Sequence, residues 1–119
     1  DRSARRLRDG LRARLGERVA VVISDTFGRV WRRGLTDVAI GCAGIRAVVD
    51  LRGTEDALGR ELAVTEVCVV DELAGAAELV MGKSSGICAA VVRGVDPSWL
   101  GRGEVRAEVV RPPTEDLFR

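Results

Sequence analysis

The 119-residue sequence predicts one small domain in which helices and strands alternate. Three segments support this prediction. Residues 3–15 place a leucine at every fourth position, which is the spacing of one helix face. Residues 19–23 are all apolar, as in a strand that is buried on both sides. Residues 61–70 are rich in valine, which favours a strand, and a second helical pattern follows them at 71–81.

Each predicted helix has candidate residues for its ends. Ser3 is a candidate N-cap and Gly16 a candidate C-cap of the first helix, and Asp71 is a candidate N-cap of the second. We assign the arginines on the outer face of the first helix to a solvated surface. The inward-facing stripe of the second helix is predicted to be Leu73, Ala76, Ala77 and Val80.

The remaining segments give a less regular pattern. Residues 45–51 and 87–92 are predicted strands, and 54–60 is predicted to be a loop. Residues 105–110 fit a strand and a helix equally well, within a predicted irregular carboxyl-terminal segment at 95–119. The spacing of Gly41 and Gly44 predicts a close approach of the backbone to a ligand or to another element. Glu66 is expected on a solvated face or in an ion pair.

The composition excludes several function classes. The sequence has no histidine, which rules out Ser-His-Asp and Cys-His catalysis and imidazole metal ligands. A net charge of +1 and 3% aromatic residues argue against nucleic-acid binding. No apolar run is long enough to span a membrane. The three cysteines lack CxxC spacing and are expected to be small buried hydrophobes, and with no secretory leader they indicate a cytoplasmic location.

The segment 24–34 is the strongest candidate for a functional site. Asp25 and Thr26 follow the apolar run and are expected to emerge at the carboxyl end of its strand. With Ser24 they offer hard oxygen ligands that suit Mg or Mn, while nearby arginines match phosphate or carboxylate. The alternative is an ordinary strand exit, in which Asp25 caps the turn and Trp31 packs over the core.

A second candidate lies after the helix predicted at 71–81. The fragment Gly82-Lys83-Ser84 resembles part of a P-loop, but it follows a helix and lacks the earlier glycine, so we reject that assignment. A glycine- and serine-rich loop with one lysine can still bind phosphate through backbone amides. Lys83 is the only lysine of the chain.

Taken together, these motifs and their order resemble the coenzyme F-420:L-glutamate ligase family. The resemblance runs from about Leu7 to Phe118 and covers the second half of a ligase domain. It rests on 24–29, 36–41, 43–45, Arg52-Gly53, Asp56, Gly59, Leu62, Thr65, Asp71-Glu72, 81–83 and Arg93-Gly94.

The resemblance implies an α+β fold, with a mixed sheet and flanking helices, that is incomplete at its amino-terminal side. It implies that Asp25 and Thr26 are catalytic and bind the divalent metal. It also implies that the loop 81–88 contacts the nucleotide. That loop consists of Met81, Gly82, Lys83, Ser84, Ser85, Gly86, Ile87 and Cys88. Because an ammonium group does not ligate a metal, phosphate pairing suits Lys83 better.

The implied activity is a GTP-dependent ligation in which Mg or Mn assists. L-Glutamate joins a deazaflavin F-420 precursor through a gamma-linked amide, by way of an acyl phosphate, in a homodimer. The alternative is a non-catalytic remnant of the same fold that binds nucleotide or serves as a dimerisation module.

Overall fold

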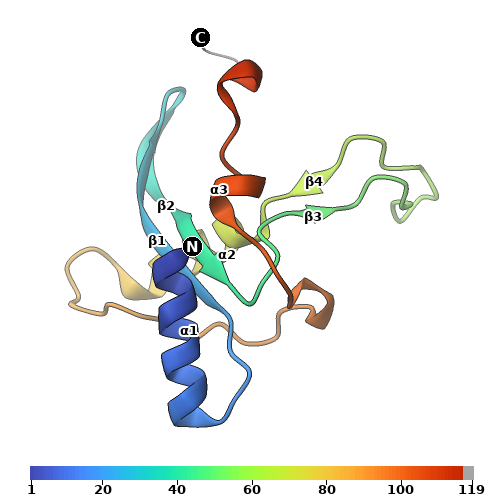
Figure 1. The fold of residues 1–119 in the computed structure, drawn as a ribbon. Helices are drawn as coiled ribbons and strands as arrows, with labels where there is room; N and C mark the ends of the chain where they lie inside the picture. The colour runs from blue at the N-terminus through green and yellow to red at the C-terminus, as the bar shows by residue number, and fades with distance from the viewer. Residues whose placement is uncertain (117–119) are drawn as a thin grey trace.

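A computed structural model describes residues 1–116 and has a long antiparallel hairpin at its centre (Figure 1). The hairpin consists of β1 (Val21–Arg29) and β2 (Arg32–Ala43). Val21 lies opposite Ala43 and Arg29 opposite Arg32, with register shifts after Ile23 and after Gly28. The base of the hairpin is partly buried, whereas its tip is exposed and Trp31 is 84% accessible. Trp31 therefore does not cover the core, contrary to the alternative considered from the sequence.

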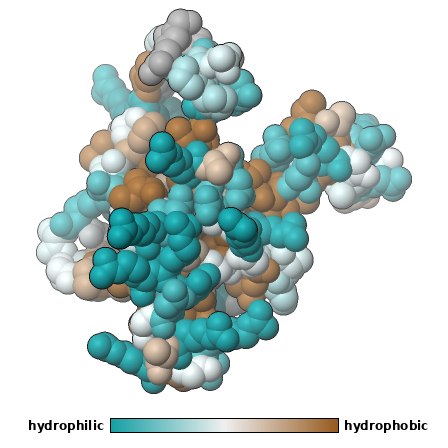
Figure 2. Space-filling view, viewed as in Figure 1, coloured by the Kyte–Doolittle hydropathy of each residue, from teal (hydrophilic) through white to brown (hydrophobic). Residues whose placement is uncertain are grey.

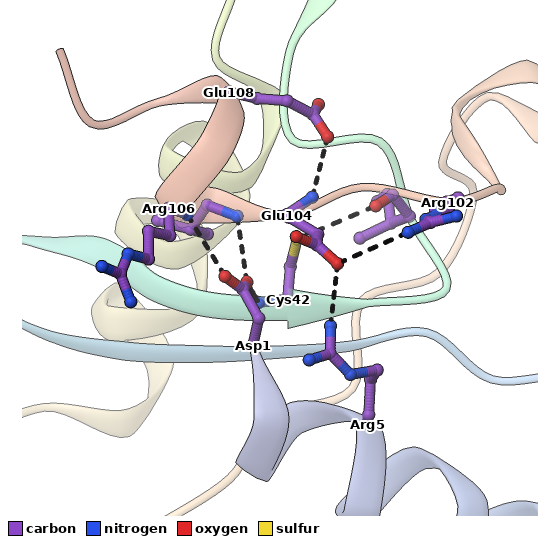
Figure 3. A network of polar contacts seen from close by, with 9 residues as sticks. Asp1, Arg5, Cys42, Arg102, Glu104, Arg106 and Glu108 are labelled. Carbon is purple, nitrogen blue, oxygen red and sulfur yellow. Dashed lines mark hydrogen bonds and ion pairs between the residues drawn. The ribbon is translucent and has the colours of Figure 1, made fainter. Parts of the chain in front are cut away.

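The core lies where the base of the hairpin meets three helices, α1 (Arg2–Leu15), α2 (Val69–Met81) and α3 (Val105–Glu108). Its side chains are small, because the chain has few aromatic residues. The Asp1 carboxylate accepts hydrogen bonds from the amides of Cys42 and Val105, at 3.0 and 2.9 Å, and so joins the start of α1 to β2 and α3 (Figure 3). The buried cluster consists of Ala39, Cys42, Ile45, Ala47, Val70 and Val105.

A second, shorter pair of strands extends from this body. It consists of β3 (Val49–Asp50) and β4 (Glu66–Val67), also antiparallel, and the chain between them forms the arm on the right of Figure 1. Two 3-10 turns, η1 (Pro97–Trp99) and η2 (Pro113–Glu115), flank α3. No helix within residues 1–116 has both the length and the apolar character needed to span a membrane.

The first predicted helix is confirmed, with two differences. Gly16 is its C-cap with φ 70°, as expected, but Asp1 and not Ser3 is the N-cap residue. The leucines at 7, 11 and 15 are 41–59% accessible, and Ala4 is the buried residue of α1. The face that packs on the hairpin is therefore the Ala4 face, and the leucine stripe stays exposed.

The strand predicted at 61–70 is wrong over most of its length. Only Glu66 and Val67 pair, and Val69 already begins α2. Asp71 is therefore in the first turn rather than at the N-cap, and its carboxylate accepts a hydrogen bond from the Ala39 amide at 2.8 Å. Burial of Val69 and Val70 against the hairpin outweighs the β-preference of valine. The buried face of α2 also differs from the predicted stripe: Ala74, which was not in that stripe, is buried, and Val80, which was, is 69% accessible.

The α+β class is confirmed, but the mixed sheet is not. Both sheets described within residues 1–116 are antiparallel pairs. Residues 87–92 form no strand there, because no described segment pairs with them, and Val91 is 80% accessible. The predicted strand 45–51 is reduced to Val49 and Asp50. Residues 105–108 prove to be helical, and 117–119 of the predicted irregular segment lie outside the described residues.

The close backbone approach predicted from the glycines is confirmed, and the neighbour is protein. A Cβ on Gly44, whose φ is 83°, would lie 3.2 Å from the Val19 carbonyl oxygen. The cysteine prediction is partly wrong: Cys42 is buried and Cys68 partly buried, but Cys88 is exposed. Cys88 belongs to the segment 87–92, which lacks the strand neighbours that would cover it.

Candidate functional site

A buried carboxylate on the central hairpin organises the candidate site. Asp37 is 6% accessible and lies on β2 opposite Thr26, while Ser24 lies opposite Ala39. Because side chains alternate along a strand, Ser24, Thr26 and Asp37 share the face of the hairpin that packs against α2. The Ser24 hydroxyl donates to Asp37 Oδ2 at 3.0 Å.

Lys83 comes from the loop after α2 and completes the coordination of this carboxylate. Its Nζ donates to Asp37 Oδ1, and Glu78 Oε1 lies 3.8 Å away. The hydrogen bond from Lys83 is the main cause that lowers the pKa of Asp37, opposed by burial and assisted by the hydroxyls of Ser24 and Thr26. The same hydrogen bond raises the pKa of Lys83, so both groups stay charged.

Asp25 lies beside this cluster but on the other face of β1. Its Oδ1 accepts a hydrogen bond from the Thr26 amide at 2.7 Å, and its charge contributes to the raised pKa of Lys83. The predicted position at a strand end is wrong, because β1 continues to Arg29. The strand continues because β2 supplies a hydrogen-bonding partner along its whole length.

The donor set of Asp25 and Thr26 fits a hard divalent cation in kind. Both residues are exposed, and carboxylate and hydroxyl oxygens are of the type that Mg and Mn prefer, but the Thr26 hydroxyl hydrogen-bonds to Asp37. Asp37 is committed to Lys83 and Ser24. No group of three or more acidic, cysteine or histidine side chains within residues 1–116 is arranged to hold a metal. Because their side chains lie on opposite faces of β1, Asp25 and Thr26 do not converge on one cation in this arrangement. Asp25 would form part of a coordination shell, with phosphate, water or further protein oxygens as the other ligands.

The predicted phosphate-binding loop is open and exposed. Met81 is the last residue of α2, and Gly82 turns the chain with φ 60°. The Ser85 hydroxyl donates to the Met81 carbonyl, so it caps the helix and is not free for a ligand. The backbone amides of Ser84 and Gly86 have no hydrogen-bond acceptor within residues 1–116.

The structure thus brings together part of the predicted site. Lys83 joins the 81–88 loop to the hairpin next to Asp25 and Thr26. Ile87 and Cys88 are exposed and form no described contact with that cluster. An open depression of about 620 Å³ borders Asp37 between β2 and α2, but neither Asp25 nor Lys83 lines it.

Asp37 is the residue that the sequence reasoning missed as part of the site. It appeared there only within the motif 36–41. Two signals point to it: it is an acidic residue in an otherwise apolar segment, and the chain has a single lysine that needs a partner if it is to be held in place. Neither signal indicates that the two residues meet.

Comparison with known proteins identifies relatives that cover the whole of this chain. The family model described as F420-0:Gamma-glutamyl ligase matches residues 1–94. A protein of Methanocaldococcus jannaschii named coenzyme F420:L-glutamate ligase is 43% identical over an alignment 120 residues long that covers the whole of this chain and 47% of that relative. Proteins with the same name from Methanopyrus kandleri and Archaeoglobus fulgidus are 46% and 45% identical, with 48% and 47% of their lengths covered.

The chain therefore spans about half the length of the curated relatives it matches. The family match extends through the hairpin, α2 and the loop that carries Lys83. On this evidence the chain belongs to the F420-0:gamma-glutamyl ligase family.

Proposed function

We propose that this chain forms part of a GTP-dependent ligase that joins L-glutamate to a deazaflavin F-420 precursor through a gamma-linked amide. Membership of the ligase family supports the reaction class. The observation that carries the proposal is the pair of Lys83 and Asp37, which holds the 81–88 loop against the strand that bears Asp25 and Thr26. A phosphate-binding loop and oxygen ligands are the parts that phosphoryl transfer needs side by side.

The proposed reaction has two steps. The terminal carboxylate of the acceptor attacks the γ-phosphorus of GTP, which forms an acyl phosphate and releases GDP. The amine of L-glutamate then attacks the acyl carbon, loses a proton, and displaces inorganic phosphate as the amide forms. Neither step needs a histidine or a nucleophilic side chain, which agrees with the composition.

Lys83 is the residue of this chain best placed to bind phosphate. Asp37 fixes its ammonium group while leaving N–H donors of Nζ free to pair with phosphate oxygens. The free amides of Ser84 and Gly86 would add neutral donors. A divalent cation, Mg or Mn, held in part by Asp25, would neutralise phosphate charge, with Thr26 on the Asp37 side of the same strand. A cytoplasmic location and a homodimer are further parts of the proposal.

A chimeric enzyme tests this function directly. The chain would replace the matching 47% of the Methanocaldococcus jannaschii relative, and mass spectrometry would follow the deazaflavin acceptor with GTP, L-glutamate and Mn. We expect a gain of glutamyl mass, and a loss of about 100-fold in rate with Asp25→Asn, because this substitution removes a carboxylate that would hold the charge-neutralising cation. The matched control is Asp9→Asn, which makes the same charge change on α1, where Asp9 pairs with Arg8.

The proposal fails if the chimera folds and assembles like the relative but adds no glutamate while the relative itself does. That result would favour the non-catalytic module. It also fails if Asp25→Asn and Asp9→Asn have equal rates. Sedimentation equilibrium of the same samples tests the homodimer.

A further inference from the structure

A basic groove lies between α1 and the segment that precedes α3, away from the residues considered above. Its volume is about 660 Å³, which is in the usual range for small-molecule sites. Its walls include backbone of Gly44 and Gly101 and the apolar side chains of Val19 and Leu100. Figure 2 shows hydrophilic residues gathered over α1 on this side of the molecule. The charged residues that line it are Arg5, Arg8, Arg12, Arg18, Arg102 and Glu104.

The arginines face the groove because of their helical spacing. Arg5, Arg8 and Arg12 are three and four positions apart, so they lie on one side of α1. Arg8 packs its stem against the hairpin, since a Cβ on Gly44 would lie 3.2 Å from its Cδ. The predicted solvated surface is confirmed for Arg5 and Arg12, which are exposed, whereas Arg8 is partly buried.

The groove contains more positive charge than its own acidic residue can balance. Glu104 Oε1 lies 3.0 Å from Arg5 and 4.0 Å from Arg102, and Figure 3 shows both guanidinium groups directed at it. Arg8 pairs with its neighbour Asp9. No carboxylate within residues 1–116 pairs with Arg12 or Arg18.

Five arginines line the groove, and Glu104 together with the Asp9 partner of Arg8 leaves three positive charges there, although the whole chain has a net charge of only +1. A groove lined by charges of one sign raises the local concentration of ions of the opposite sign. Guanidinium groups bind carboxylates and phosphates in a bidentate manner, so two unpaired arginines suit a ligand with at least two anionic groups.

We propose that this groove binds a small molecule that carries two or more carboxylate or phosphate groups. Arg12 and Arg18 hold the anionic groups, and Arg5 and Arg102 are placed beside them by Glu104. No residue of the groove belongs to the Asp25, Asp37 and Lys83 cluster, so the proposal is independent of the ligase activity.

The test is calorimetric titration of the 119-residue chain at low salt with two probes. Inorganic pyrophosphate represents phosphate ligands, and gamma-glutamylglutamate represents carboxylate ligands. We expect at least one to bind and the stronger of the two to identify the class. The double variant Arg12→Gln/Arg18→Gln should weaken that binding at least about tenfold, the effect of losing two charge-assisted hydrogen-bond partners.

The matched control is Arg6→Gln/Arg14→Gln, which removes the same charge from α1 at positions that do not line the groove. Lys83→Met tests whether the probe binds at the candidate ligase site instead. The proposal is overturned if neither probe binds, if both double variants weaken binding equally, if Lys83→Met abolishes it, or if a single-stranded oligonucleotide binds more tightly than either probe. Circular dichroism of each variant verifies that α1 is intact.

Discussion

Lys83 donates a hydrogen bond to Asp37 across 46 positions of sequence, and this pair joins the loop after α2 to the central hairpin. Asp37 is buried, whereas the side chain of Lys83 is half exposed. One end of the pair is therefore rigid and the other can reach a ligand.

Substitution of Asp37 should be visible in the reactivity of Lys83. Asp37→Asn removes the partner that raises the pKa of Lys83, so the free-amine fraction at pH 9 should increase, about tenfold for each unit by which the pKa falls. Because Lys83 is the chain's single lysine, acylation followed by peptide mapping separates it from the terminal amine. The control Asp50→Asn disrupts an exposed pair with Arg52 and should leave the acylation rate of Lys83 unchanged. An unchanged rate in Asp37→Asn would contradict the pair.

The same pair should stabilise the fold over a defined pH range. The pKa of Asp37 is lowered from 3.8, so its contribution is present above about pH 4 and is lost on acidification below that value. The pKa of Lys83 is raised from 10.5, so its contribution is present below that pH and is lost as the pH rises further. Urea midpoints of the wild type and of Asp37→Asn/Lys83→Met should differ most near pH 7 and converge at both extremes. A difference that does not depend on pH would show that packing, not charge, is responsible.

Arg52 should control the titration of Asp50 at the start of the β3–β4 arm. Hydrogen bonds from Arg52 lower the pKa of Asp50 to about 2, and Arg52 also lies 3.2 Å from Glu66 across the strand pair. Arg52→Gln should raise the pKa of Asp50 toward 3.8, as measured by carboxyl-carbon NMR. In the wild type this contribution to stability is lost as the pH falls from about 4 to about 2. Arg60→Gln, which removes a charge elsewhere on the arm, should leave the pKa of Asp50 unchanged.

The three cysteines should react at very different rates. Cys88 is exposed, whereas burial raises the pKa of Cys68 to about 11 and also raises that of Cys42. Because the thiolate is the reactive form, one thiol should label rapidly at pH 7.5, and Cys88→Ser should remove that phase. Rapid labelling of Cys42 would show that the core is open.

Two glycine substitutions should have opposite effects on stability. A Cβ on Gly103 would lie 2.6 Å from the Ala47 amide and closer still to the Ile45 carbonyl, so Gly103→Ala should destabilise the fold by about 1–3 kcal/mol. Gly10 is inside α1, and nothing lies within 4 Å of a Cβ added there. Gly10→Ala should therefore stabilise the fold by about 0.5–1 kcal/mol. Urea denaturation of both variants measures the two changes, and equal effects would contradict this packing.

Local pattern was sufficient for α1 and for most of α2, but not for α3, which fitted a strand and a helix equally well. The leucine spacing located α1, and Gly16 ends it as expected, because helix formation and capping depend on residues within one or two turns. The hairpin was missed because its turn at Val30 and Trp31 has none of the asparagine and glycine residues typical of two-residue turns. The strand at 87–92 was predicted wrongly because a strand needs a hydrogen-bonding partner, which apolar composition cannot supply.

The sequence by itself determined the available chemistry: no histidine, one lysine, an Asp-Thr pair, and a motif order that identifies the family. Only the tertiary structure decided which of these groups meet. It buried Asp37 against Lys83, placed Asp25 on the opposite face from Thr26, and gathered five arginines around one groove. The physical reason is that propensity acts between near neighbours, whereas contacts between distant residues depend on how the helices pack against the hairpin.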